Sequence, residues 1–172
     1  ELRWIIGIII NTGMRLSETV GLSKDDIFLS SDITHLRVIP RPLRRLKTSS
    51  SERSIPLVGV SLWAAQKASE ASESHFIFPK YCNENNASSN SASAALNKWL
   101  QRNINGKIVV HSLRHAMRDR LRNIECPSSV IDSIGGWASG SVGESYGLGH
   151  PMSIKLKWLK LSERDTLSWK SR

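Results

Sequence analysis

Hydrophobic residues recur at intervals of three and four over most of the chain, the spacing that places them on one face of an α-helix. The pattern begins with a nearly unbroken hydrophobic run at residues 4–10, WIIGIII, which we interpret as a buried helix. A further short helix is expected at residues 126–137. Pro127 suits its first turn, and Gly135 and Gly136 suit its end. Between these two segments, three longer stretches have the pattern of amphipathic helices: residues 61–72, 91–103 and 111–123.

The pattern changes after the first helix. Two short pieces, HLRVI at residues 35–39 and RSIPLV at residues 53–58, are rich in β-prone residues and are separated by Pro, Ser, Lys and Arg. They predict a small antiparallel sheet whose last turn lies near residues 47–52. A polar loop is expected at residues 83–93. The chain therefore has the pattern of a mainly α fold with one small antiparallel β-sheet, an α+β protein.

The tail of the chain, residues 150–172, is compatible with two structures. As a helix it would bury Ile154, Trp158 and Leu161, which are spaced at four and three residues. As a strand it would use the alternation of IKLKW at residues 154–158. Helical spacing fits the full length of the segment better.

Length and composition indicate one soluble globular domain. The chain has 172 residues, 40% of them hydrophobic and 23% charged, which is enough for a single buried core. The hydrophobic run at residues 4–10 is too short to span a bilayer and lacks the basic lead-in of a signal peptide. Because the first residue already lies inside a predicted helix, we expect a fragment that begins at a domain boundary. Cys82 and Cys126 lack the spacing of a zinc site or disulfide framework, which fits a reducing cytosol.

The charge of the chain is strongly basic. There are 24 Lys and Arg against 15 Asp and Glu, which gives a net charge of +9 and a pI near 10. Such an excess suits a polyanionic partner such as nucleic acid, because bound cations displace the counterions that condense on it. Composition alone leaves open the alternative of a basic soluble protein without such a partner.

Six residues in four separate segments carry candidate chemistry. Taken singly, each has an ordinary alternative: a solvated charge, a surface pair on a helix, or a half-buried aromatic anchor. In chain order they are Arg15 in NTGMRLSETVGL, Lys47 in RRLKTSSSERSIPL, His111 and Arg114 in HSLRHAMRDRL, and Trp137 and Tyr146 in SIGGWASGSVGESYG.

Together these segments resemble the catalytic domain of the tyrosine recombinase (phage integrase) family. That family carries, in this order, an Arg in a TGxRxxE motif, a hairpin Lys, an HxxR motif, a His or Trp, and a Tyr nucleophile. The resemblance covers nearly the whole chain, so it implies the tyrosine recombinase catalytic-domain fold over residues 1–172. It also implies a DNA-binding domain upstream of Glu1.

The chemistry of DNA strand cleavage needs these residue types. Arg15 and Arg114 can each give two parallel hydrogen bonds to a phosphate and hold charge at the transition state. Two arginines could thus take the place of a metal ion, and the sequence has neither the clustered carboxylates of a magnesium nuclease nor a GxxxxGK[ST] loop for ATP. We expect no cofactor and no metal.

The resemblance implies a role for each remaining residue. Tyr146 attacks the phosphate and leaves a 3′-phosphotyrosine link and a free 5′-hydroxyl. Lys47 donates a proton to that leaving oxygen, and His111 helps to remove the phenol proton or braces the phosphate. Trp137 stands where the family more often has His, and its indole can only donate a hydrogen bond, so slower or differently tuned chemistry is expected. Glu18 fits the acidic position of TGxRxxE and is expected to orient backbone or an arginine.

Arg41, Arg44 and Arg45 crowd the chain just before Lys47. Their charges could lower the pKa of the lysine by repulsion and so make it a better proton donor. They could equally contact the DNA backbone, and we favour that interpretation for at least two of them.

The predicted function is site-specific DNA recombination by an integrase that cleaves and rejoins strands through the phosphotyrosine link. One alternative is relaxation of DNA in the manner of a type IB topoisomerase, and another is a basic DNA-binding module without catalysis. The resemblance further implies double-stranded DNA as partner, a tetramer on DNA, accessory DNA-bending proteins, no membrane, and a bacterial cytoplasm with a phage or mobile element as source. It suggests that residues 150–172 dock on a neighbouring protomer, against the alternative of packing on their own domain.

Overall fold

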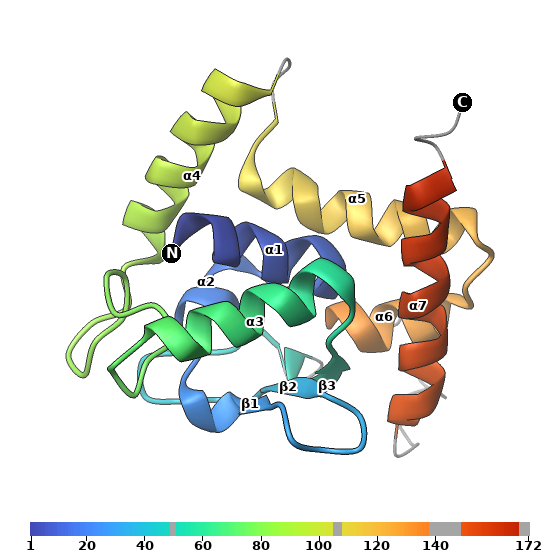
Figure 1. The fold of residues 1–172 in the computed structure, drawn as a ribbon, viewed down its shortest axis with the longest axis horizontal. Helices are drawn as coiled ribbons and strands as arrows, with labels where there is room; N and C mark the ends of the chain where they lie inside the picture. Colours follow the sequence, from blue (N-terminus) through green and yellow to red (C-terminus); the bar gives the residue numbers. More distant parts are fainter. Residues whose placement is uncertain (49–50, 105–107, 138–148, 169–172) are drawn as a thin grey trace.

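The computed structural model describes residues 1–48, 51–104, 108–137 and 149–168, with side chains described as far as residue 163. The predicted fold class is confirmed: helices dominate, and one small antiparallel sheet accompanies them (Figure 1). In chain order the elements are α1 (Leu2–Thr12), α2 (Leu16–Val20), the 3₁₀ turn η1 (Lys24–Asp26), β1 (Ile27–Phe28), β2 (His35–Val38), β3 (Arg53–Pro56), α3 (Gly59–Ala71), α4 (Ser89–Asn103), α5 (Val110–Asn123), α6 (Ser128–Gly135) and α7 (Met152–Ser168).

Helix α1 lies at the centre of the helical layer, between α3 and α5 (Figure 1). Ile5, Ile8 and Ile9 are buried in the core, as the hydrophobic run at residues 4–10 predicted. The α1 backbone approaches α3 closely at Gly7, where a Cβ atom would lie 2.8 Å from Cβ of Ala64. The hydrophobic residues of α1 therefore provide the platform against which the other helices pack.

The sheet has the order β1-β2-β3, and both pairs are antiparallel. Leu36 pairs with Ile55, and Val38 pairs with Arg53, so these four residues share the buried face of the sheet. The sequence predicted β2 and β3. It did not predict β1, because two residues are too few to show an alternating pattern. The buried face thus carries one arginine among hydrophobic residues.

Helices α3 to α6 occupy the segments that the hydrophobic spacing predicted. Pro127 precedes the first residue of α6, and Gly136 ends the helix with φ 67°, ψ 45°. This left-handed conformation favours glycine, which has no Cβ to clash with the backbone. A Cβ at Gly136 would also lie 2.6 Å from Nη1 of Arg53. Glycine is therefore needed both for the turn and for the close approach of an arginine side chain.

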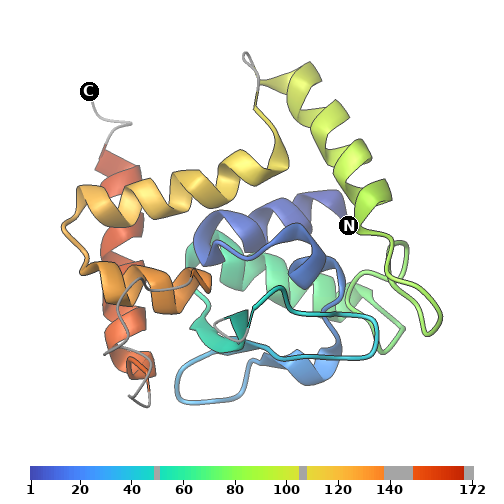
Figure 2. The same ribbon diagram turned by 180° about the vertical axis from the view of Figure 1, so that it is seen from behind.

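Helix α7 forms one side of the molecule and α4 the opposite side (Figures 1 and 2). The helical prediction for the tail is confirmed, and α7 packs on its own domain against β3, α5 and α6. The predicted buried face is confirmed only in part: Trp158 is partly buried against the core, but Ile154 is 38% exposed, whereas Leu159 is 1% exposed and Lys155 is also buried. The Lys155 Nζ donates a hydrogen bond to the Ser54 carbonyl at 3.1 Å. Because a buried lysine with a backbone partner forms part of the buried face of α7, the spacing of hydrophobic residues alone does not identify that face.

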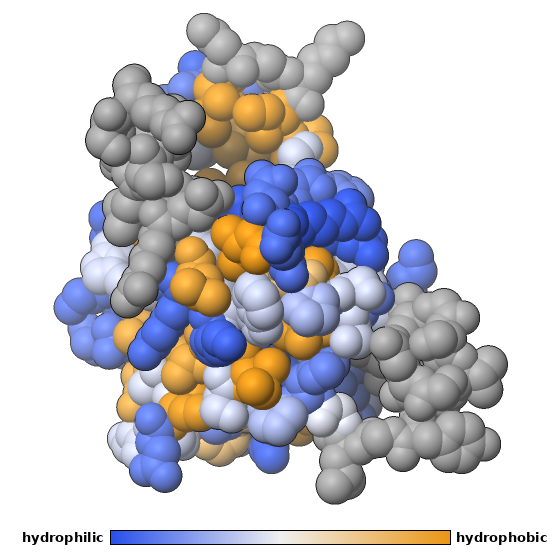
Figure 3. Space-filling model, turned by 90° about the vertical axis from the view of Figure 1, so that its right-hand side faces the viewer, coloured by the Kyte–Doolittle hydropathy of each residue, from blue (hydrophilic) through white to orange (hydrophobic). Residues whose placement is uncertain are grey.

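On the side that α7 occupies, hydrophobic side chains lie scattered among hydrophilic ones (Figure 3). None of the helices described here is both long enough and apolar enough to cross a membrane.

Candidate active site

The TGMR segment forms a tight reversal between α1 and α2. Thr12 Oγ1 donates to the Ile8 carbonyl at 2.6 Å and accepts from the Met14 N–H at 3.3 Å. Gly13 ends α1 with φ 63°, and its N–H bonds to the Ile9 carbonyl. This left-handed turn requires glycine, and it places Arg15 at the N-terminus of α2.

Arg15 is held by partners from three parts of the chain. Its Nη1 donates to Glu18 Oε1 at 2.6 Å and to Ser51 Oγ at 2.9 Å, and its Nη2 donates to the Gly136 carbonyl at 3.3 Å. Its backbone N–H donates to Glu18 Oε2 at 3.0 Å, which confirms that Glu18 orients both backbone and an arginine. The Arg15 side chain is 23% exposed, so part of the guanidinium faces solvent.

Glu18 is buried and has a second arginine partner, Arg53, whose Nη2 lies 2.9 Å from Glu18 Oε2. Burial alone would raise the pKa of Glu18, but the charge and hydrogen bonds of Arg53, with the hydrogen bonds from Arg15, hold the pKa below its ordinary value. Arg53 was not among the site residues predicted from the sequence. A signal was present, because Arg53 has the same strand parity as Ile55 and therefore points to the core.

Arg114 on α5 connects the end of α1 to the end of α6. Its Nη1 donates to the Gly13 carbonyl and, at 2.7 Å, to the Gly135 carbonyl. The residue is 3% exposed. Burial, followed by the charges of Arg15 and Arg53, lowers the pKa of Arg114 to about 9. The guanidinium is thus still charged at neutral pH, and it lies within electrostatic range of Arg15.

The Trp137 ring lies against two arginines. Its centroid is 4.2 Å from Cζ of Arg114 and 4.8 Å from Cζ of Arg118. The ring also fills space beside two glycines: a Cβ at Gly135 would lie 1.7 Å from Trp137 Cζ3, and a Cβ at Gly13 would lie 3.6 Å from Cη2. Trp137 therefore covers the guanidinium of Arg114 in this structure.

His111 occupies the first turn of α5 on the exposed surface and contacts His115 edge to face, with ring centroids 4.7 Å apart. Partial burial lowers the pKa of His111, as do the charges of His115, Arg114, Arg15 and Lys47. The imidazole is therefore mostly neutral at pH 7. Lys47 is exposed in the connection between β2 and β3, close enough for its charge to act on His111.

Five of the six predicted catalytic residues thus come together where α1, α2, α5, α6 and the β2–β3 connection meet. The sixth, Tyr146, lies outside the described residues. It belongs to the segment between Trp137 and the residues that lead into α7. Among the side chains that are described, no group of three or more His, Cys, Asp and Glu residues is arranged to hold a metal ion.

The arginines predicted to contact DNA divide into two kinds. Arg44 is 2% exposed, and its Nη1 donates to Asp26 Oδ2 and to the Gly21 carbonyl. Arg41 donates through Nε and Nη2 to Asp26 Oδ1. Both hold a buried carboxylate, which is a structural role that the sequence did not predict. Arg45 is exposed and stays a prediction as a DNA contact.

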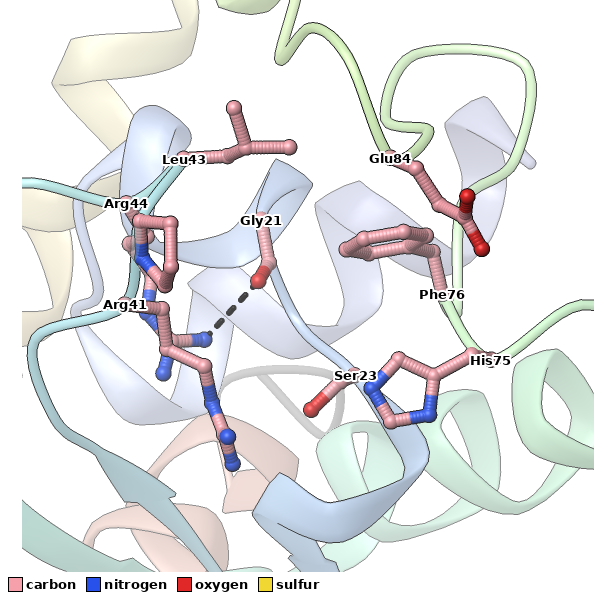
Figure 4. A pocket seen from close by; sticks show the side chains of 9 residues that line it. Gly21, Ser23, Arg41, Leu43, Arg44, His75, Phe76 and Glu84 are labelled. Atoms are coloured by element: carbon pink, nitrogen blue, oxygen red, sulfur yellow. Dashed lines mark hydrogen bonds between the residues drawn. The ribbon is translucent and has the colours of Figure 1, made fainter.

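Arg41 and Arg44 also form one wall of a pocket of about 260 Å³, with His75, Phe76 and Glu84 across from them (Figure 4). Leu43, which lies between the two arginines in the sequence, lines the pocket as well. The pocket shares none of its lining residues with the five clustered catalytic candidates.

The Asp26 ion pairs predict a dependence of stability on acid. Burial alone would raise the pKa of Asp26, but the hydrogen bonds from Arg44, Arg41 and the Ser23 backbone lower it below the ordinary 3.8. The resulting stabilisation is complete above the unfolded pKa and is lost as pH falls through the lower folded pKa. We expect Asp26→Asn to unfold with about 1–3 kcal/mol less free energy at neutral pH, and to lose less stability than the wild type below pH 3.8.

Urea unfolding midpoints measured at neutral and acid pH test this expectation. Asp119→Asn is the control, because Asp119 is exposed and pairs only at the surface. An Asp26→Asn profile parallel to that of the wild type would contradict it.

Comparison with known proteins finds one matching family model and several solved structures with a similar fold. The sequence model of the Phage integrase family matches residues 1–147. The Tn1549 transposon integrase in complex with circular intermediate DNA has a TM-score of 0.57 at 18% identity, over 90% of this chain and 57% of that one. The XerH site-specific recombinase bound to a palindromic difH substrate has a TM-score of 0.54 at 17% identity, over 100% of this chain and 46% of that one.

Identities of this size show a shared fold, and the chain spans little more than half of the length of the Tn1549 integrase chain that it matches. A search of curated proteins found no match.

Proposed function

The chain belongs to the phage integrase family of tyrosine recombinases, and on that premise we propose that it catalyses site-specific DNA strand cleavage and rejoining through a 3′-phosphotyrosine intermediate. One observation carries the proposal. Arg15 and Arg114 are 99 positions apart in the chain, and they bond to the adjacent carbonyls of Gly136 and Gly135. Two guanidinium groups therefore meet at the end of α6, directly before the segment that contains Tyr146.

The proposed step is an in-line displacement at phosphorus. The phenol oxygen of Tyr146 forms a bond to phosphorus as the bond to the 5′-oxygen breaks, and a 3′-phosphotyrosine and a 5′-hydroxyl result. The phenol proton passes toward His111, which is neutral at pH 7 and free to accept it. Lys47 gives a proton to the leaving oxygen. Arg15 and Arg114 balance the negative charge that develops on the non-bridging oxygens.

Trp137 must change place for this step. In the described structure its ring lies on Arg114, which is 3% exposed. We propose that DNA displaces the indole, so that Arg114 reaches the phosphate and the indole N–H donates to a phosphate oxygen. A stacked guanidinium is held by roughly 1–2 kcal/mol, which a charge-assisted bond to phosphate can replace.

Double-stranded DNA is the proposed partner. The net charge of +9 and the exposed Arg45 and Lys47 support it. The wider assembly belongs to the same proposal: a DNA-binding domain before Glu1, a tetramer on DNA, accessory DNA-bending proteins, and a bacterial cytoplasm with a phage or mobile element as source. Docking of residues 150–172 on a neighbouring protomer stays a prediction.

A nicked suicide substrate tests the proposed function. The full-length parent protein is incubated in EDTA with a long cognate site whose nick lets the cleaved fragment diffuse away. Denaturing electrophoresis then detects protein covalently bound to DNA. We expect an adduct. Absence of the adduct would count against the recombinase assignment, and relaxation of plasmids that lack the site would favour topoisomerase-like activity instead.

The lowered pKa of His111 predicts the pH dependence of cleavage. Because the neutral imidazole accepts the phenol proton, the single-turnover rate should be constant near pH 7 and fall as pH drops through a pKa below 6.5. His111→Gln should be slow and lack this step. His115→Gln removes a charge that lowers the pKa of His111, so in this variant the fall in cleavage rate should occur at a higher pH than in the wild type. A His111→Gln profile with the wild-type step would exclude this role.

A further inference from the structure

Arg53 connects three segments that meet at the site. Its Nε donates to the Ile134 carbonyl at 2.7 Å, its Nη1 to the Ser51 carbonyl at 2.5 Å, and its Nη2 to Glu18 Oε2 at 2.9 Å. These partners lie on α6, next to the start of β3, and on α2. Each of the three guanidinium nitrogens therefore bonds to a different segment, and the side chain is 3% exposed.

Arg53 and Arg15 share these same segments. Both donate to the Glu18 carboxylate. Arg15 donates to the hydroxyl of Ser51, and Arg53 to its carbonyl. At the end of α6, Arg15 bonds to the carbonyl of Gly136, which caps the helix, and Arg53 bonds to the carbonyl of Ile134. Arg53 thus bonds directly to two of the three hydrogen-bond partners of the Arg15 guanidinium, Glu18 and Ser51, and to the helix α6 that precedes the third.

The charges add a second consequence. Glu18 carries one negative charge between two guanidinium groups, so the three side chains together keep one positive charge. Arg53 is the more deeply buried of the two arginines, with 3% of its side chain exposed against 23% for Arg15. A buried carboxylate needs a cationic partner, and Arg53 supplies it. Without Arg53, Glu18 would form its full ion pair with Arg15 and neutralise the charge that faces solvent.

We propose that Arg53 is a positioning residue of the cleavage reaction: it neutralises Glu18, so that Arg15 is held in place with its charge available to the scissile phosphate. The proposal rests on the proposed function. Arg53 does not touch the phosphate, and its effect on the rate passes through Arg15.

A substrate with one charge removed tests the link between the two arginines. A methylphosphonate at the scissile position replaces one non-bridging oxygen by a methyl group, which removes the negative charge that Arg15 is to balance. On the phosphate substrate, we expect Arg53→Gln to be slower than the wild type by on the order of a hundredfold. One methylphosphonate stereoisomer is expected to bring the cleavage rate of Arg15→Ala closer to that of the wild type. On the same stereoisomer, the rate of Arg53→Gln should also come closer to that of the wild type.

A double variant gives an independent measurement. If Arg53 acts through Arg15, then Arg15→Ala with Arg53→Gln should be no slower than Arg15→Ala alone. Arg44→Gln is the matched control, since it also removes a buried arginine from a buried carboxylate. It should lower the unfolding midpoint without a stereoisomer-dependent change in rate. If Arg53→Gln does not fold, Arg53→Lys replaces it, because lysine keeps the charge and loses the three-way fork.

The results separate this proposal from the proposed function. The role of Arg53 would be overturned if its substitution reduced the cleavage rate equally on phosphate and methylphosphonate. It would also be overturned if the rate reductions of the Arg53 variant and Arg15→Ala multiplied in the double variant. Failure of the wild type to form any adduct would overturn the recombinase assignment itself.

Discussion

Tyr146→Phe is expected to form no covalent adduct with the suicide substrate and to bind the same DNA with unchanged affinity. The substitution removes only the phenol oxygen, which is the atom proposed to bond to phosphorus, and keeps the aromatic ring. Loss of the nucleophile removes the reaction path altogether. This is the largest effect that we predict for a single substitution.

Two measurements on one preparation check this expectation. Denaturing electrophoresis measures the adduct, and a native gel shift measures binding. Ser141→Ala and Ser145→Ala are the matched controls, because each removes a rival hydroxyl from the same segment, and both should keep the adduct. An adduct that persists in Tyr146→Phe and disappears in a serine variant would assign the nucleophile to that serine.

The longer helices and the two longer strands could be predicted because their information is local, whereas the short α2 and the turn η1 were not predicted. Hydrophobic spacing marked α1 and α3 to α6, and Pro127 with Gly136 marked the ends of α6. The order of the motifs likewise indicated five residues that the fold gathers at one place. Local patterns and motif order therefore carried most of the fold and most of the site.

Hydrophobic spacing did not reveal the partners of the buried arginines, although strand parity placed Arg53 on the inward face of β3. Arg44 pairs with Asp26, 18 positions before it, and Arg53 pairs with Glu18, 35 positions before it. A charge can enter the core only when a partner reaches it there, and one-dimensional spacing does not reveal such a partner. Arg44 was therefore interpreted as a DNA contact, and Arg53 was overlooked.

The buried face of α7 has the same explanation. Lys155 lies inward because the Ser54 carbonyl accepts a hydrogen bond from its Nζ, and Ile154 is left at the surface. Burial lowers the pKa of Lys155, with a further contribution from the charge of Arg53. In this protein, polar groups with distant backbone or side-chain partners decide the details that hydrophobic patterns leave open.

Arg114→Ala is expected to slow cleavage by roughly a hundred- to a thousandfold, the typical effect of losing one donor to a developing oxyanion. It should also lower the unfolding midpoint. The substitution leaves the Gly13 and Gly135 carbonyls without their guanidinium partner and removes one of the two cations against the Trp137 ring. One side chain thus both orders the resting site and serves the proposed reaction.

Arg122→Ala is the matched control on the same helix. Arg122 and Asp119 form an ion pair at 3.5 Å, and more than half of each side chain is exposed. Such surface pairs contribute about 0–1 kcal/mol, so both its unfolding midpoint and its cleavage rate should stay near wild type. Single-turnover cleavage is measured at saturating DNA and at a temperature where Arg114→Ala is folded. Because the variant is folded under these conditions, its rate reports the chemical step alone. A wild-type rate in Arg114→Ala would therefore exclude Arg114 from the reaction.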